Sequence, residues 1–165
     1  MLAWAAHAAG DLDEARRRFE TSLAFRQELG DRFATAVEIA NLGDLALERG
    51  DLVEAARRHG AALSVARDLD SRYLLVNELP SFAALAARLG DFETAARLLG
   101  ATDAVAEAAG IVPDPGTDRN VEAELGERLP ESQVVSLRTE GARLTLSEAV
   151  ALAMAVARAI SGDSA

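Results

Sequence analysis

The sequence contains no cysteine and no lysine, and it holds only one Trp, one Tyr and five Phe among 165 residues. Without cysteine the chain forms no disulfide, thiolate metal site or cysteine nucleophile. Without lysine it has neither a Schiff-base amine nor the lysine of a phosphate-binding loop. These absences remove several classes of enzyme. The lack of cysteine also fits a reducing cytoplasm, which is the location that we expect.

Basic charge and long apolar runs are also scarce. The formal net charge is −10, whereas nucleic-acid binding usually needs a basic face, so we expect no direct contact with nucleic acid. The basic run at 16–18 has Glu14 and Glu20 beside it, and it is typical of a solvated helix face. The longest apolar run, 149–157, is too short to span a bilayer, so we expect no membrane partner.

A glycine–aspartate pair returns at regular intervals. It begins at Gly10, Gly30, Gly50 and Gly90, and Asp70-Ser71 stands at the position where the pair is missing. Each glycine can end a helix in the left-handed conformation, and the Asp or Ser after it can cap the next helix. The interval predicts helices of about sixteen or seventeen residues, about 25 Å long.

Alternate segments resemble one another, which makes the repeating unit about forty residues long. The segments GDLDEAR, GDLVEAAR and GDFETAAR begin at 10, 50 and 90, and Ala15, Ala55 and Ala95 share one position in them. A small residue at a fixed position lets two helices approach closely. Because one helical hairpin cannot cover its own apolar face, such hairpins must stack. We therefore expect an all-α fold of stacked antiparallel hairpins.

The run NLGDLA at 41–46, followed by GDLVEA at 50–55, resembles a tetratricopeptide repeat. Leu42, Gly43, Gly50, Asp51 and Ala55 fall on the signature positions of that family. The resemblance implies a right-handed solenoid in which the first helix of each hairpin lines a concave surface. The forty-residue period, against about 34 in the family, implies longer helices.

Two further segments, AARLLGA at 95–101 and EGARLTLSEAV at 140–150, are similar to the C-terminal end of large bacterial signal-transduction ATPases of the LuxR and related antibiotic-regulator types. The resemblance implies a non-catalytic sensor and protein-interaction module of a transcription regulator. Neither a phosphate loop nor a helix-turn-helix signature occurs in this chain. Two alternatives stay open: a free-standing scaffold that self-associates, and a small-molecule sensor with a pocket between Pro80 and the C-terminal cap.

The sequence divides into a hairpin array at 1–110, a Pro/Gly loop at 111–120 and a helical cap of the same domain at 121–165. Residues 1–9 align with 41–49, so we expect the first repeat to be truncated by about ten residues. Pro80 predicts a kink or a break in the helix at 72–89, with Ser81 as a new cap. In the cap we expect helices near 119–128, 131–140 and 146–160, the last of them packed on the third hairpin. Thr145 and Glu148 have capping-box spacing.

Two sets of residues are candidates for binding. Leu2 and Trp4 could form an exposed edge for homodimerisation, although Trp4 packed on the first hairpin is an equal alternative. Polar residues of two first helices could form a groove for a peptide or a small ligand, with a solvated concave face as the alternative. The candidate groove consists of Glu38, Asn41, Asp44, Glu48, Arg72, Asn77, Ser81 and Arg88.

The two histidines offer no catalytic or metal site. Neither His7 nor His59 has metal-ligand spacing to another histidine or carboxylate. His59 shares its repeat position with Phe19 and Leu99, which predicts a packed helix residue. We expect no metal, no cofactor and no enzymatic activity, and a protein or peptide as the partner.

Overall fold

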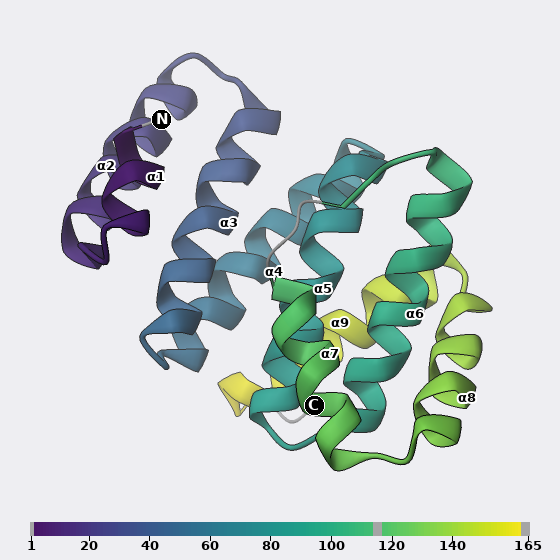
Figure 1. Ribbon diagram of the computed structural model, residues 1–165. Helices are drawn as coiled ribbons and strands as arrows, with labels where there is room; N and C mark the ends of the chain where they lie inside the picture. Colours follow the sequence, from purple (N-terminus) through teal and green to yellow (C-terminus); the bar gives the residue numbers. More distant parts are fainter. Residues whose placement is uncertain (1, 114–116, 163–165) are drawn as a thin grey trace.

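The computed structural model describes residues 2–113 and 117–162, and every regular element in these ranges is an α-helix (Figure 1). Helices α2 to α5 have seventeen residues each and α6 has eighteen. These lengths confirm the prediction from the twenty-residue interval. The helices are α1 (Leu2–Ala8), α2 (Leu12–Glu28), α3 (Arg32–Glu48), α4 (Leu52–Asp68), α5 (Arg72–Arg88), α6 (Phe92–Ala109), α7 (Thr117–Arg128), α8 (Glu131–Ala142) and α9 (Leu146–Ser161).

The repeated pair builds each turn between the first six helices. The four glycines of the pair have φ between 70° and 79°, and Asp70 takes the same left-handed conformation with φ 47°. Glycine enters this region without the steric cost that a Cβ brings. The side chains of Asp11, Asp31, Asp51, Ser71 and Asp91 each accept a hydrogen bond from the backbone N–H three residues later. Each such cap stabilises its helix by about 1 kcal/mol, and the predicted turn chemistry is confirmed.

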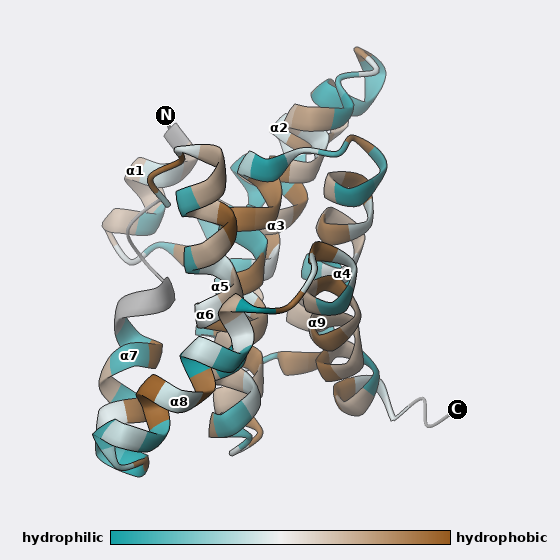
Figure 2. Ribbon diagram, turned by 90° about the vertical axis from the view of Figure 1, so that its right-hand side faces the viewer, coloured by the Kyte–Doolittle hydropathy of each residue, from teal (hydrophilic) through white to brown (hydrophobic). Residues whose placement is uncertain are grey.

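The helices pack in neighbouring pairs, α1 on α2, α3 on α4 and α5 on α6, and successive pairs meet through α2 with α3 and α4 with α5. Ala15, Ala55 and Ala95 are fully buried, as expected for small residues at helix contacts. Hydrophobic residues are frequent on α3, α4 and α9 (Figure 2). The main core runs from α3 to α9, whereas Ala15, Phe19 and residues of α3 form a separate small cluster beneath the first pair.

Pro80 lies inside α5, which continues without a break from Arg72 to Arg88. The predicted break is therefore wrong, and Ser81 lies within the helix, 3% exposed, instead of capping a new one. Proline costs α5 one backbone donor. The helix persists because α5 packs against α4, α6, α7 and α9, with Leu79 and Phe82 fully buried beside the proline.

The C-terminal helices cover the array on several sides. Helix α8 packs on α6, and α7 packs on α5. The prediction of a loop to residue 120 is wrong, because α7 begins at Thr117; within 111–120, residues 114–116 lie outside the described ranges. Helix α9 contacts α4 as well as α5 and α6, so it does not pack on the third hairpin alone. Its buried Ala149 and Ala153 are small enough to let it approach these helices closely.

The capping box predicted for α9 is present: Glu148 N–H donates to Thr145 Oγ1, and Glu148 Oε2 accepts from Thr145 N–H at 2.7 Å. In the part of the chain that the structure describes, no single helix is both long and apolar enough to cross a membrane. Helices α8 and α9 pass that test only as a pair, and they are bent by 120° at the break between them.

Candidate functional site

A cavity of about 480 Å³ opens between α1, α3, α5 and α7. Its walls come from the first helix of each pair and from the first helix of the C-terminal segment, which lies over α5 in Figure 1. Val37, Leu47 and Leu74 give it apolar surface, and amides, carboxylates and a guanidinium give it polar surface. This size and mixture are typical of sites that hold a small organic ligand.

Six of the eight residues predicted to form the groove line this cavity. Glu38 and Arg72 do not line it: Ser22 Oγ donates to Glu38 Oε1 at 2.6 Å, and Arg72 lies 3.6 Å from Asp70 at the turn. The predicted residues that do line it are Asn41, Asp44, Glu48, Asn77, Ser81 and Arg88. They come from α3 and α5, two first helices that the tetratricopeptide resemblance implied to line one concave surface.

Trp4 also lines the cavity and is 50% exposed. Its ring meets those of His7 and Phe19 edge-on, with centroids 5.5 Å apart in both cases. Trp4 is therefore packed on the first hairpin while part of its surface faces the cavity. The side chain of Leu2, the other residue of the predicted edge, lies outside the described residues.

Behind the cavity wall, His59 of α4 lies between two carboxylates. Its Nδ1 is 3.1 Å from Glu78 Oε2, and its Nε2 is 3.6 Å from Asp44 Oδ1. The prediction that His59 is a packed helix residue is confirmed, since its side chain is fully buried and the ring of Phe82 lies 6.2 Å away. Both carboxylates line the cavity, but His59 does not.

Gly43 of α3 makes the space for this imidazole. A Cβ at Gly43 would lie 2.7 Å from His59 Nε2. The third hairpin has Ala83 and Leu99 at the two matching positions. The sequence analysis did not predict the cluster of Asp44, His59 and Glu78. One signal for it was present: the second hairpin alone combines a glycine, Gly43, with a polar residue, His59, at these two positions.

The ionisation of the cluster is perturbed. Burial, opposed in part by His59, acts together with the charges of Glu78 and Glu48 to raise the pKa of Asp44 to about 6. Burial alone would lower the pKa of His59, but the hydrogen bond to Glu78 and the charges of Glu78 and Asp44 outweigh it and raise the pKa above its ordinary value. An imidazole whose pKa is raised thus lies behind the cavity wall, and a carboxyl with a pKa of about 6 lies in that wall.

The cavity carries an excess of negative charge. His7 Nε2 lies 2.7 Å from Glu48 Oε1 at one wall. Arg88 is exposed and forms no ion pair or hydrogen bond through its side chain with any residue in the described ranges. Asp44, Glu48, Glu78 and Glu124 are the carboxylates of the lining. A pocket with several carboxylates and one guanidinium attracts positively charged groups.

The arginines of α2 are held by carboxylates. Arg16 Nε donates to Glu20 at 2.9 Å, and Arg17 and Arg18 bind Glu14 at 2.7 Å. The solvated helix face predicted for this run is therefore confirmed. Glu14 binds these arginines through its side chain, and its backbone N–H donates to the Asp11 cap at the start of α2.

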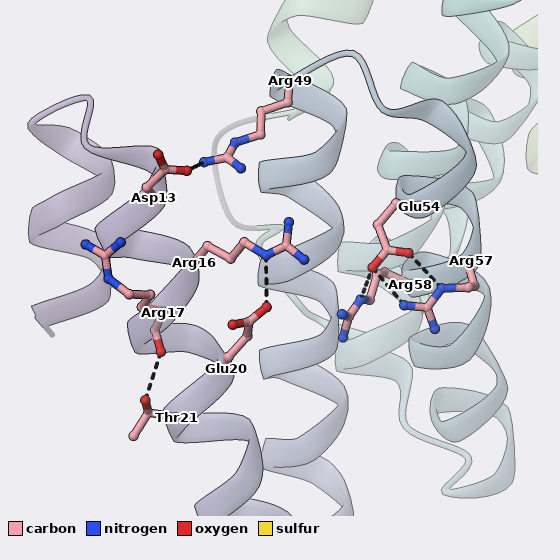
Figure 3. Close-up of polar contacts among 9 residues, drawn as sticks. All are labelled: Asp13, Arg16, Arg17, Glu20, Thr21, Arg49, Glu54, Arg57 and Arg58. Carbon is pink, nitrogen blue, oxygen red and sulfur yellow. Dashed lines mark hydrogen bonds and ion pairs between the residues drawn. The ribbon is translucent and has the colours of Figure 1, made fainter.

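A second depression, between α2, α3 and α4, is much smaller. Its volume is about 30 Å³, about that of one water molecule. Its arginines hold carboxylates: Arg49 pairs with Asp13, and Glu54 binds Arg57 and Arg58 at 2.7 Å (Figure 3). The hydrogen bonds from Arg57 and Arg58 lower the pKa of Glu54 to about 2. With its charges already paired, this depression is a poor candidate for a ligand site.

No group of three or more His, Asp or Glu side chains in the described ranges could hold a metal ion. Comparison of the chain with protein-family models, with curated proteins and with solved structures finds no match. The cavity lined by α1, α3, α5 and α7 is the larger of the two depressions described above and the better candidate site. It offers hydrogen bonds and charge to a polar ligand.

Proposed function

We propose that this chain is a non-catalytic sensor and interaction module, and that it binds a small polar ligand or a peptide side chain in the cavity. The observation that carries the proposal is a space of about 480 Å³ lined by polar groups from four helices. Its position, with Pro80 on one wall and Val121 of the C-terminal cap on another, favours the small-molecule alternative that the sequence left open.

The cavity also suggests how binding would be transmitted. The first helix pair rests on a small cluster that includes Phe19 and Leu42, separate from the main core. A ligand that contacts Trp4 on α1 and Asn77 on α5 would hold that pair against the rest of the chain. Binding energy realised only in the closed arrangement shifts the population towards it. We therefore expect ligand binding to reduce the motion of α1 and α2 relative to the rest of the chain.

We interpret the helix pairs as tetratricopeptide-like hairpins stacked in a right-handed solenoid with a period of forty residues. The sequence repeat and the packing in neighbouring pairs support this interpretation. The assignment to the cytoplasmic sensor end of a bacterial transcription regulator rests on the residues at 95–101 and 140–150. The intact mass of the native gene product tests it, because attached domains would make the chain several times larger than 17.4 kDa.

A thermal-shift screen of the chain with a library of polar small molecules tests the binding function. Ligands should raise the melting temperature, since a ligand at a hundred times its Kd stabilises the folded state by about 2.7 kcal/mol. Ala40→Trp fills the cavity from α3 and should abolish these shifts. Ala61→Trp, at an exposed position of α4, should retain them. Failure of every compound, or equal shifts in Ala40→Trp, would refute the proposal.

A further inference from the structure

We infer that the cavity recognises a positively charged nitrogen group, a primary ammonium or a guanidinium, with Asp44 as its main partner. The inference rests on the proposed binding function and adds the chemical class of the ligand. The group can belong to a free small amine or to a lysine or arginine side chain of a peptide. Both sources present the same donors to the same carboxylate.

Asp44 makes no hydrogen bond through its side chain in the described ranges, whereas the neighbouring carboxylates do. Glu48 has His7 at 2.7 Å and Glu78 has His59 at 3.1 Å. The nearest cationic atom to the Asp44 carboxylate, on His59, is 3.6 Å away, beyond hydrogen-bond distance. An ionised carboxylate in a sheltered site is costly unless it is paired.

A ligand in the cavity can reach Asp44 but not the pair of His59 and Glu78. The side chain of Asp44 is 35% exposed and lines the cavity, whereas His59 and Glu78 behind it are at most 4% exposed. His59 therefore interacts with Glu78 and does not contact a ligand in the cavity. An ammonium or guanidinium that enters can donate directly to Asp44, in a site where charge-assisted hydrogen bonds are strong.

The rest of the cavity lining also suits a cationic group. Trp4 and Tyr73 line the cavity and are 50% and 40% exposed, so they offer aromatic surface to a cation. Val37 and Leu74 offer apolar surface to an aliphatic stem. The guanidinium of Arg88 is the one permanent cation of the lining, against four carboxylates. This combination favours a cationic head on a short apolar chain over an anionic ligand.

Titration calorimetry with agmatine and putrescine tests the inference, with neutral 1,4-butanediol and anionic succinate as matched probes. We expect the two amines to bind and the other two probes not to bind. Asp44→Asn should weaken agmatine binding more than tenfold. Glu107→Gln, which removes one negative charge from an exposed position of α6, should leave binding unchanged. Because Asp44→Asn should not reduce stability, lost binding would not reflect unfolding, and circular dichroism checks this.

Proton exchange gives a second readout. The groups that face Asp44 are His59, Glu78, Glu48 and His7, and a bound cation favours the ionised form of Asp44 over the neutral one. Agmatine binding near pH 6 should therefore release protons, which calorimetry in buffers of different ionisation enthalpy measures. Affinity should rise from about pH 5 to about pH 7. A pH-independent affinity without proton release would overturn the assignment to Asp44.

The outcomes separate this inference from the proposed function. If succinate or butanediol binds the wild type at least as well as agmatine, or if Asp44→Asn binds agmatine normally, the inference is wrong. If none of the four probes binds but neutral or anionic library compounds still stabilise the chain, the inference fails and the binding function stands. If no compound of any charge binds, both fail.

A short peptide with a C-terminal arginine, compared with the same peptide carrying citrulline, distinguishes the two sources of the cation. Tighter binding of the arginine peptide than of agmatine would assign the site to a peptide side chain. Tighter binding of agmatine would assign it to a free amine. Equal binding of the arginine and citrulline peptides would argue against recognition of charge.

Discussion

Gly100 of α6 and Gly141 of α8 lie where the two helix backbones meet. A Cβ at Gly100 would overlap the carbonyl group of Arg138, and a Cβ at Gly141 would overlap that of Arg97. The opposing atoms belong to the backbone and cannot move aside as a flexible side chain can. Small residues at these two positions therefore let α8 pack closely on α6.

Gly100→Ala should therefore destabilise the chain by at least about 1–3 kcal/mol, because the added methyl group forces the two helices apart. Urea unfolding followed by circular dichroism measures the change. Gly126→Ala is the matched control, since a Cβ there meets nothing within 4 Å in α7. It should stabilise the helix by about 0.5–1 kcal/mol. Equal effects of the two substitutions would contradict the close contact.

Replacing one member of the buried pair of His59 and Glu78 should destabilise the fold more than replacing both. His59→Leu leaves the Glu78 carboxylate buried without its partner, and Glu78→Leu does the same to the imidazole. Each should destabilise by about 3–5 kcal/mol. The double variant should cost clearly less than the sum of the two, and a double-mutant cycle of unfolding free energies measures the coupling. Additive effects would show that the 3.1 Å contact contributes no coupling.

Asp44→Asn should flatten the pH dependence of stability. A carboxyl whose pKa rises on folding, here from 3.8 to about 6, stabilises the fold fully below the unfolded value, and this contribution is lost as the pH rises through about 6. The raised pKa of His59 acts in the same direction at higher pH. The wild type should therefore lose stability through Asp44 as the pH rises from about 4 to about 6, and through His59 as the pH rises above about 6.5.

At about pH 7.5, Asp44→Asn should be more stable than the wild type by about 1 kcal/mol. This is less than the full pKa shift implies, because the side chain is 35% exposed and solvent screens it. Thermal unfolding across the pH range measures the difference, with Glu107→Gln as the control. Parallel profiles for the wild type and Asp44→Asn would show that Asp44 does not titrate on folding as described.

The pair Leu2→Glu and Trp4→Glu separates two roles for the first helix. If Trp4 serves as a cavity wall, the double variant should lose agmatine binding while its sedimentation mass stays that of the wild type. If the edge mediates self-association, as a free-standing scaffold requires, the wild type should form a homodimer that the variant dissociates. Concentration-dependent sedimentation decides between these results.

The sequence by itself determined where the helices of the array begin and end. Gly50 and Asp51 act through their own backbone conformation and one hydrogen bond across three residues, so the turn that they form needs no help from distant segments. The same chemistry recurs at each turn and sets the helix length. The buried alanines, Ala55 among them, were likewise readable because they repeat at a fixed position.

Only the tertiary structure decided which side chains of neighbouring helices contact one another. Pro80 carries a local preference for a break, but packing on several sides of α5 overrides it. The contacts of Asp44 with His59 and of His59 with Glu78 join three helices, so they depend on the register between neighbouring hairpins. A repeat fixes that register only through side-chain packing. For that reason the sequence named several of the polar residues around the cavity but not their partners.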